Sequence, residues 1–188
     1  MSVGVIVLII VIVLIVILAL VAFSQFNKLR RLDVRVDGAM GDIDTLLTKR
    51  ADLVPNLVET VKGSRDFEAS TLEAVTSARA SAAGATSIDA KAAADASLTG
   101  ALSRLFAVAE AYPQLTATAN FRDLQTQLAD LESQLQFARQ YYNDSVVQLN
   151  TAIKTVPSMW FTGIASVSAR PMYSEPDAGR REAPKVDF

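Results

Sequence analysis

The chain has 188 residues, a formal net charge of −2 and 51% hydrophobic residues, and its length suits one domain with short appendages. It contains no cysteine and no histidine. This composition excludes a disulfide framework, a thiol nucleophile, cysteine lipidation, the usual zinc and copper ligands and the commonest general base. The near-neutral charge gives no basic footprint for nucleic acid, so we expect no nucleic-acid partner.

The first predicted element is an apolar helix near the N-terminus. The stretch from Val3 to Phe23 includes no charged or strongly polar side chain. At about 1.5 Å per residue, such a helix would cross the roughly 30 Å core of a bilayer. The alternative is a cleaved signal peptide, but the apolar run is too long for one, and no Lys or Arg precedes it. Residues 1–25 are therefore predicted to form an uncleaved transmembrane anchor.

The charges that follow this stretch predict its orientation. Lys28, Arg30, Arg31 and Arg35 lie just after it, whereas no positive side chain precedes it. Because cytoplasmic flanks carry the excess of Lys and Arg, we expect a single-pass protein whose remaining residues lie in the cytoplasm.

Beyond the anchor, apolar residues recur at alternating spacings of three and four, as in helices that pack nearly parallel. The first series is Leu29, Leu32, Val36, Ala39, Ile43 and Leu46; Arg50 interrupts it, and Leu53 and Leu57 resume it. The second is Leu98, Leu102, Leu105, Ala109 and Tyr112. The longest is Phe121, Leu124, Leu128, Leu131, Leu135, Ala138, Tyr142, Leu149, Ala152 and Val156, with Ser145 at its one polar position.

No segment of strand length alternates with period two, so the sequence predicts an all-α protein. We expect a single N-terminal transmembrane helix followed by an elongated antiparallel three- to four-helix bundle over residues 26–157. Residues 158–188 mix proline, glycine and alternating charges, and we expect them to be a mostly disordered C-terminal tail.

Helix-breaking and helix-capping residues divide the bundle. Gly84 is expected to end one helix and Ser87 to cap the next. Pro113 should stop that helix, Asn120 should cap the last one, and Pro157 should close it.

Pro55 lies between apolar residues that keep a helical spacing. A proline inside a helix costs about 3 kcal/mol, because it removes a hydrogen bond and crowds the preceding turn. Two interpretations remain open. Either Asp52 caps a new helix and Pro55 lies in its first turn, or one continuous helix bends there. The bend could serve packing alone, or it could also expose a recognition surface.

Several charged and polar side chains are possible site residues, but none predicts chemistry. Arg104 and Glu110 flank apolar residues, and Arg104 is expected to pair with an acid on another helix, such as Asp144 or Glu59. Tyr142 is expected to pack inside with its hydroxyl satisfied.

Three carboxylates, Asp42, Asp44 and Asp52, are the nearest approach to a site for a hard metal ion. Asp42 and Asp44 are two residues apart and do not converge on a helix, so we interpret the group as a solvated face. The sequence predicts no catalytic, cofactor-binding or metal-binding residue, and no cofactor.

Several segments together resemble the LemA family of bacterial membrane proteins. They are RADLVPNLVETVKG, TLEAVTSARA, LSRLFAVAEAYPQL, NFRDLQTQLADLESQLQFARQYYND and VVQLN. The resemblance covers about residues 27–157. It implies a helical bundle behind one N-terminal transmembrane helix, in a family without established enzymatic activity. Its relatives include a magnetosome-membrane protein, and some members occur beside membrane proteases or TPM-domain proteins.

Three functions follow as hypotheses. The first is a non-catalytic, membrane-anchored protein for interaction, scaffolding or assembly at the bacterial inner membrane, expected to be oligomeric. The second is a membrane-shaping or envelope-stress component associated with a membrane protease or TPM-domain protein. The third, a hydrolase that uses only carboxylates, lacks a converging pair.

The expected partners are the lipid bilayer and either a second copy of the chain or another membrane protein, with no small-molecule substrate identified. The argument for assembly is that Met40, Leu47, Val54 and Val58 lie outside the main apolar series of their helix. Such residues would leave a second apolar face to be covered.

Overall fold

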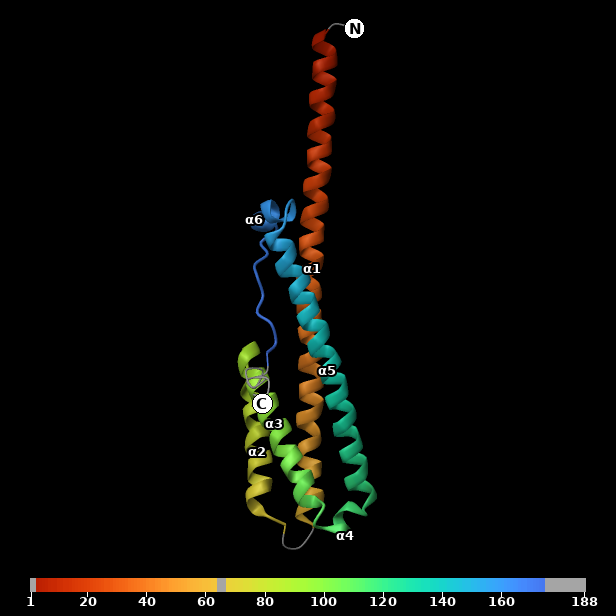
Figure 1. The fold of residues 1–188 in the computed structure, drawn as a ribbon, viewed down its shortest axis with the longest axis vertical. Helices are drawn as coiled ribbons and strands as arrows, with labels where there is room; N and C mark the ends of the chain where they lie inside the picture. Colours follow the sequence, from red (N-terminus) through yellow and green to blue (C-terminus); the bar gives the residue numbers. More distant parts are fainter. Residues whose placement is uncertain (1–2, 64–66, 175–188) are drawn as a thin grey trace, which may run out of the picture. The chain divides into compact units, whose positions relative to one another are not determined.

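The computed structural model describes residues 3–63 and 67–174 (Figure 1). Two long helices are α1, Val3–Lys62, and α5, Ala119–Lys154. Between them lie α2, Ala69–Gly84, α3, Ile88–Ala109, and the short α4, Pro113–Thr116. A 3-10 turn, η1, Ser158–Phe161, and a short helix, α6, Thr162–Ala165, follow α5. The described residues contain no strand, so the predicted all-α fold class is confirmed.

The chain divides into two compact units. The bundle unit comprises residues 41–141 and continues from residue 172, and the N-terminal unit comprises residues 1–40 and 142–171. Both α1 and α5 contribute residues to each unit.

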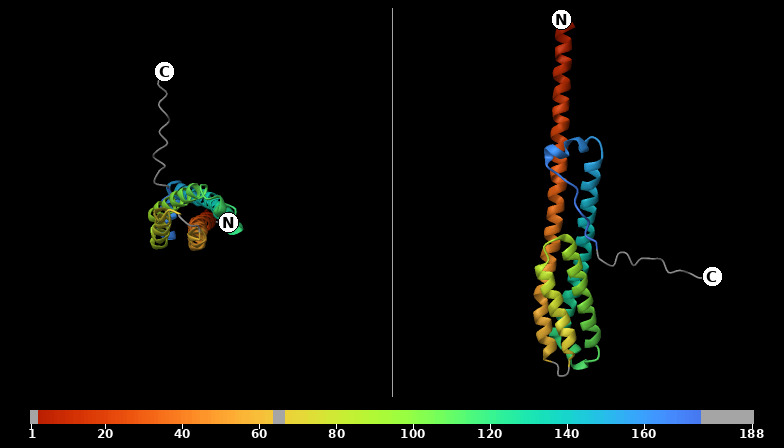
Figure 2. Two further views of the ribbon diagram at one scale, coloured as in Figure 1. Left: turned by 90° about the horizontal axis from the view of Figure 1, so that it is seen from below. Right: turned by 90° about the vertical axis from the view of Figure 1, so that its left-hand side faces the viewer.

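In the bundle unit, segments of α1, α2, α3 and α5 run antiparallel to one another in chain order (Figures 1 and 2). The buried core residues come from all four helices: Val54, Leu57, Val58, Val61, Val75, Ala78, Leu98, Leu102, Leu105, Ala109, Leu115, Phe121 and Leu128. Most of them occupy the predicted three-and-four spacing. The core therefore forms because that spacing places one apolar stripe of each helix toward its neighbours.

Two ends of helices follow the predicted signals. The helix α2 ends at Gly84, and the Ser87 side chain accepts a hydrogen bond from the Ala90 N–H at the start of α3. The prediction that Asn120 caps the last helix is wrong. The hydroxyl of Thr118 accepts a bond of 3.4 Å from the Phe121 N–H, because Thr118 directly precedes the first residue of α5 and so occupies the capping position.

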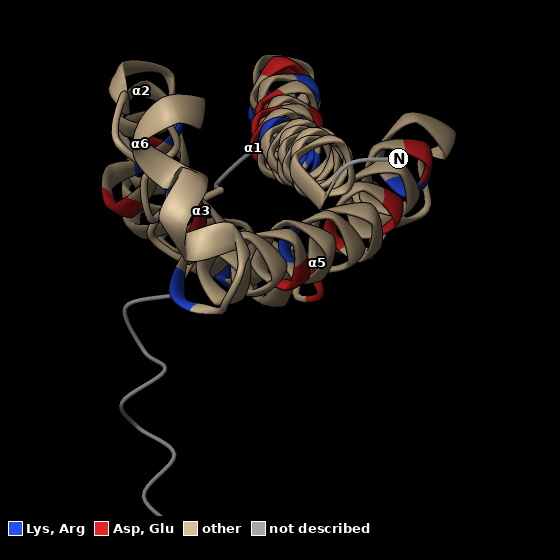
Figure 3. Cartoon of the chain, turned by 90° about the horizontal axis from the view of Figure 1, so that it is seen from above, with Lys and Arg blue, Asp and Glu red and all other residues tan. Residues whose placement is uncertain are grey.

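The N-terminal unit contains the apolar part of α1, the end of α5, η1, α6 and the segment that follows them (Figure 2). Leu29, Val36, Val146, Leu149 and Ala152 are among its buried residues. Within residues 3–63 and 67–174, α1 is the helix that is long and apolar enough to cross a membrane, by length and composition alone. In Figure 3 its end toward the N-terminus carries no blue or red residue.

The first half of the predicted disordered tail is folded in this structure. Ser158, Ala165, Val167 and Tyr173 are buried. Disorder was expected because the average composition of this segment is polar. The burial of these few spaced residues is enough to order it. The predicted disorder of residues 175–188 lies outside the described residues.

Candidate functional site

A cluster of charged side chains lies inside the bundle unit. It consists of Arg50 from α1, Asp95 from α3, Glu132 and Arg139 from α5, and Tyr173, and we refer to it as the charge cluster. Arg50 is 3% exposed and Asp95 is 2% exposed. Groups of this kind are seldom buried unless they are paired.

Arg50 joins three helices. Its Nη1 lies 2.9 Å from Asp95 Oδ1 and 2.8 Å from Glu132 Oε2. The same nitrogen donates to the Thr99 hydroxyl at 3.0 Å. The residue that interrupts the apolar series of α1 therefore binds to α3 and α5 through hydrogen bonds and ion pairs.

The second arginine approaches the same carboxylates from α5. Arg139 pairs with Asp95 Oδ2, and its Nη1 lies 3.4 Å from Glu132 Oε1. The Tyr173 hydroxyl donates to Asp95 Oδ2 at 3.1 Å, and its ring centroid lies 5.8 Å from Arg139 Cζ. Such a cation–π contact attaches Tyr173, which follows α6 in the chain, to the cluster.

Two cations and two anions balance within the charge cluster. Burial lowers the pKa of Arg139, but the neighbouring Asp95 and Glu132 outweigh this effect and raise the pKa above its ordinary value. Burial, together with Asp95, raises the pKa of the Tyr173 hydroxyl. The arginine stays charged and the tyrosine stays neutral across the physiological range.

This arrangement is suited to fixing helix positions rather than to reacting with a substrate. Both carboxylates accept bonds from guanidinium groups of the same cluster. A general acid or base instead needs a proton-transferring group within reach of a bound substrate. Buried ion pairs contribute little net stability compared with apolar residues, but breaking one is costly, so they disfavour alternative helix registers.

A second polar contact explains how α1 continues through Pro55. The helix does not restart at Asp52; it runs unbroken to Lys62, so the continuous-helix alternative is the observed one. A proline at this position leaves the carbonyl four residues earlier, that of Ala51, without its helical partner. Arg79 Nε from α2 donates to this Ala51 oxygen at 2.9 Å, which replaces the missing bond.

The surroundings of Arg79 include a cleft of about 380 Å³ bounded by α1 and α2 and by Lys91 of α3. Lys91 Nζ lies 2.6 Å from Asp44 Oδ1 in its lining. Asp42 and Asp52 are exposed. In the described part of the chain, no three acidic side chains are placed to hold a metal ion.

Among the described residues, Arg104 forms no ion pair with the predicted partners Asp144 and Glu59. Arg104, Glu110, Glu59 and Asp144 are all exposed, and the buried pairing is made by Arg50 and Arg139 instead. A sequence signal for this existed. Arg50 and Asp95 both occupy positions of the apolar three-and-four spacing, where an unpaired charge would be costly.

In the N-terminal unit, polar contacts hold the segment that follows α6. Arg170 Nη2 lies 2.9 Å from Asp33 Oδ1 and 3.1 Å from Asp37 Oδ1. The Asn150 amide both donates to and accepts from the backbone of Arg170, at 2.9 Å each. Tyr142 is buried and its hydroxyl donates to the Pro171 carbonyl at 2.9 Å, which confirms the prediction for this tyrosine.

These features define an all-α helical-bundle protein with an N-terminal helix suited to crossing a membrane. The model of the LemA family matches residues 39–188. The chain therefore belongs to the LemA family, which is membrane-associated. No curated protein matches it. The match begins later than the resemblance read from the sequence, and it extends past residue 157 into the C-terminal segment.

Proposed function

We propose that this chain is a non-catalytic, membrane-anchored protein that serves interaction, scaffolding or assembly at the bacterial inner membrane. The observation that carries the proposal is the composition of α1. The part of this helix nearest the N-terminus is strongly apolar and exposed, while later residues of the same helix contribute to the bundle core. Apolar surface of this extent requires a cover, and a bilayer supplies one of the right thickness.

The charge cluster supports the non-catalytic part of the proposal. Its carboxylates and guanidinium groups form ion pairs with one another inside the bundle unit. They serve as internal cross-links between helices. Purified protein is expected to show no turnover of esterase, phosphatase or peptidase substrates that depends on a single Asp or Glu. A rate that survives further purification and is abolished by Glu132→Gln would contradict this.

We propose that the bundle lies in the cytoplasm, because the positive-inside rule favours the side that carries Lys28, Arg30, Arg31 and Arg35. The absence of native cysteine gives a clean test. Intact cells carrying either Ser2→Cys or Ser103→Cys would be treated with an impermeant thiol reagent; Ser103 is exposed on α3. We expect labelling of Ser2→Cys only. Labelling of Ser103→Cys alone would reverse the orientation.

Assembly is supported by a different surface from the one that the sequence suggested. Val54 and Val58 are buried in the bundle core, and Met40 and Leu47 are half-buried, so these four residues do not form a second, fully exposed face. Phe137 of α5 is instead 74% exposed in the bundle unit. An exposed aromatic of this size is suited to contact with a second copy or with another membrane protein.

The alternative role, membrane shaping or envelope stress beside a membrane protease or TPM-domain protein, differs in what purification yields. A membrane-shaping array should form large particles of defined size in detergent or in vesicles. A scaffold for another protein should instead co-purify with that protein from crosslinked membranes.

A further inference from the structure

The segment after α5 exposes several large apolar side chains at the surface of the N-terminal unit. Trp160 of η1 is 67% exposed, Ile164 of α6 is 72% exposed and Met159 is 42% exposed. Neighbouring Ser158 and Ala165 are buried. The η1–α6 turn, Ser158–Ala165, is thus fixed at its two ends and presents its apolar residues outward.

A hydrogen bond fixes the height of this turn along α1. The Ser158 hydroxyl donates to Gln25 Oε1 at 2.7 Å, and Ser158 is 1% exposed. Gln25 lies two residues past Phe23, the last residue of the apolar stretch, so the two are separated by about 3 Å along the helix. Figures 1 and 2 both place η1 and α6 beside α1, past its apolar part.

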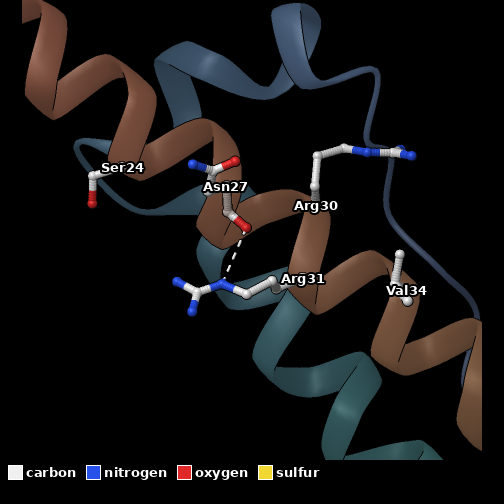
Figure 4. Close-up of a pocket in the computed structure, with 5 residues that line it drawn as sticks. All are labelled: Ser24, Asn27, Arg30, Arg31 and Val34. Atoms are coloured by element: carbon white, nitrogen blue, oxygen red, sulfur yellow. Dashed lines mark hydrogen bonds between the residues drawn. The ribbon is translucent and has the colours of Figure 1, made fainter.

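Basic side chains follow Gln25 on α1, about 8–9 Å further along the helix. Arg30 and Arg31 follow Gln25 by less than two helical turns and project to different sides of the helix (Figure 4). Arg31 is held by a bond of 3.3 Å from its Nε to the Asn27 carbonyl. The pocket in Figure 4 is lined by residues of α1 alone, so it is the surface of one helix rather than a ligand site.

We propose that the η1–α6 turn is a second membrane contact, in which Trp160, Met159 and Ile164 insert at the boundary between lipid headgroups and acyl chains. The inference rests on the proposed anchor. If the apolar part of α1 crosses the bilayer, the bond to Gln25 holds the turn at headgroup depth. Tryptophan favours this depth, apolar neighbours bury in the acyl boundary, and the adjacent arginines attract anionic headgroups.

Lipid is the occupant that the position of the turn selects. A protein partner could cover apolar side chains anywhere on the surface. The turn, however, is hydrogen-bonded to Gln25, two residues past the end of the apolar stretch. Any molecule that covers the turn at this position must share the space with lipid headgroups.

Trp160 is the only tryptophan of the chain, so its fluorescence reports this contact directly. The full chain would be reconstituted into vesicles of mixed zwitterionic and anionic phospholipid. Separate samples would contain lipid brominated near the headgroup end or near the methyl end of the acyl chain. We expect blue-shifted emission that shallow bromine quenches more strongly than deep bromine.

Four results would overturn the proposal. Emission as in water, or blue-shifted emission that neither lipid quenches, would place Trp160 in solvent or against protein. Stronger quenching by deep bromine would place it inside the acyl core. Extraction of the chain from the vesicles by alkali would contradict the anchor as well, whereas any of the other three results in alkali-resistant protein would leave the anchor standing.

A pair of variants isolates the contribution of the turn. Ile164→Asp should reduce the shallow quenching by about half or more, because it places a charge beside Trp160 in the interface. Gln134→Asp, which introduces the same charge at an exposed position of the bundle unit, should leave the quenching unchanged. Circular dichroism should show equal helix content in both. If Ile164→Asp lowers the helix content, Ile164→Gln provides the same comparison without a charge, and equal quenching in it and the parent chain would contradict the proposal.

Discussion

The bundle unit and the N-terminal unit each hold an arginine between two carboxylates, but they differ in how far these groups lie from water. In the bundle unit the side chains of Arg50 and Asp95 are 4% and 2% exposed. In the N-terminal unit the side chain of Arg170 is 37% exposed, and those of its partners Asp33 and Asp37 are 11% and 59% exposed. An exposed pair exchanges solvation for attraction at little net gain, whereas a buried pair is strongly destabilising once one partner is removed.

This difference teaches what each set of charges does. In the charge cluster, every charged side chain is paired in the observed alignment of α1, α3 and α5. A different alignment would leave a charge unpaired. The Arg170 contacts hold the segment that follows α6 within the N-terminal unit, together with neutral hydrogen bonds from Asn150 and Tyr142. The following predictions test this contrast in order of decreasing effect.

The largest expected effect is that of Asp95→Ala. It leaves Arg50 and Arg139 with one carboxylate fewer in a buried site, and should lower the free energy of unfolding by about 3–5 kcal/mol. Asp37→Ala removes an exposed partner of Arg170 and should cost less than about 1 kcal/mol. Denaturant titration of the detergent-solubilised chain measures both, and equal losses would contradict the contrast.

Apolar burial should show no such contrast between the units. Leu135 in the bundle unit and Leu149 in the N-terminal unit are both 0% exposed. Leu135→Ala and Leu149→Ala should each cost about 2–5 kcal/mol, and Gln134→Ala, at an exposed position, should be close to neutral. Thermal melts compare the three. A loss for Gln134→Ala that matches the leucine variants would mean that the buried face of α5 is assigned wrongly.

The contact between Arg79 and the Ala51 carbonyl should depend on Pro55. Arg79→Met keeps most of the apolar stem and leaves the carbonyl unpaired, which should cost about 1–3 kcal/mol. In a Pro55→Ala background, the alanine N–H would bond the same carbonyl, so Arg79→Met should cost clearly less. A double-mutant cycle measures this coupling, and strictly additive effects would exclude it.

The smallest expected effect concerns pH. The pKa of the Tyr173 hydroxyl is raised in the folded chain, chiefly by burial and then by Asp95. The folded state therefore holds this proton more tightly than the unfolded state, in which tyrosines titrate at a pH of about 10. The stabilising contribution is fully present below that pH and is lost as the pH rises above it.

Tyr173→Phe is the matched variant for this pH dependence. It should cost about 1 kcal/mol near neutral pH, through loss of the bond to Asp95. It should also lose less stability than the parent chain above a pH of about 10. Denaturation midpoints measured on both sides of that pH decide the matter; identical alkaline slopes for the two chains would refute the role given to Tyr173.

The sequence was sufficient to predict the helices and most of their buried faces, because the apolar spacing repeats over many turns. It also identified the ends at Gly84 and Ser87, where local chemistry decides. It did not distinguish the continuous helix at Pro55 from a restart at Asp52. The partner that resolves this, Arg79, lies 28 residues away, and its position depends on how α2 packs.

The charge cluster was less accessible from the sequence. Arg50 was visible as an interruption of an apolar series, but its partners Asp95 and Glu132 lie on other helices. Pairing across helices depends on their relative register, which periodicity alone does not determine. The same reason accounts for the wrong emphasis on Arg104, which lies between Leu102 and Leu105 of the apolar series although its own side chain is exposed.

Crosslinking in intact membranes tests the proposed role in interaction and assembly most directly. A photoreactive amino acid at Phe137, and in a separate sample at Trp160, would be activated in cells, and the attached molecules would be identified by mass spectrometry. Activation at Phe137 is expected to yield a second copy of this chain or another membrane protein, and activation at Trp160 is expected to yield lipid. Recovery of the chain alone, without a crosslinked protein neighbour from Phe137, would contradict the proposed role.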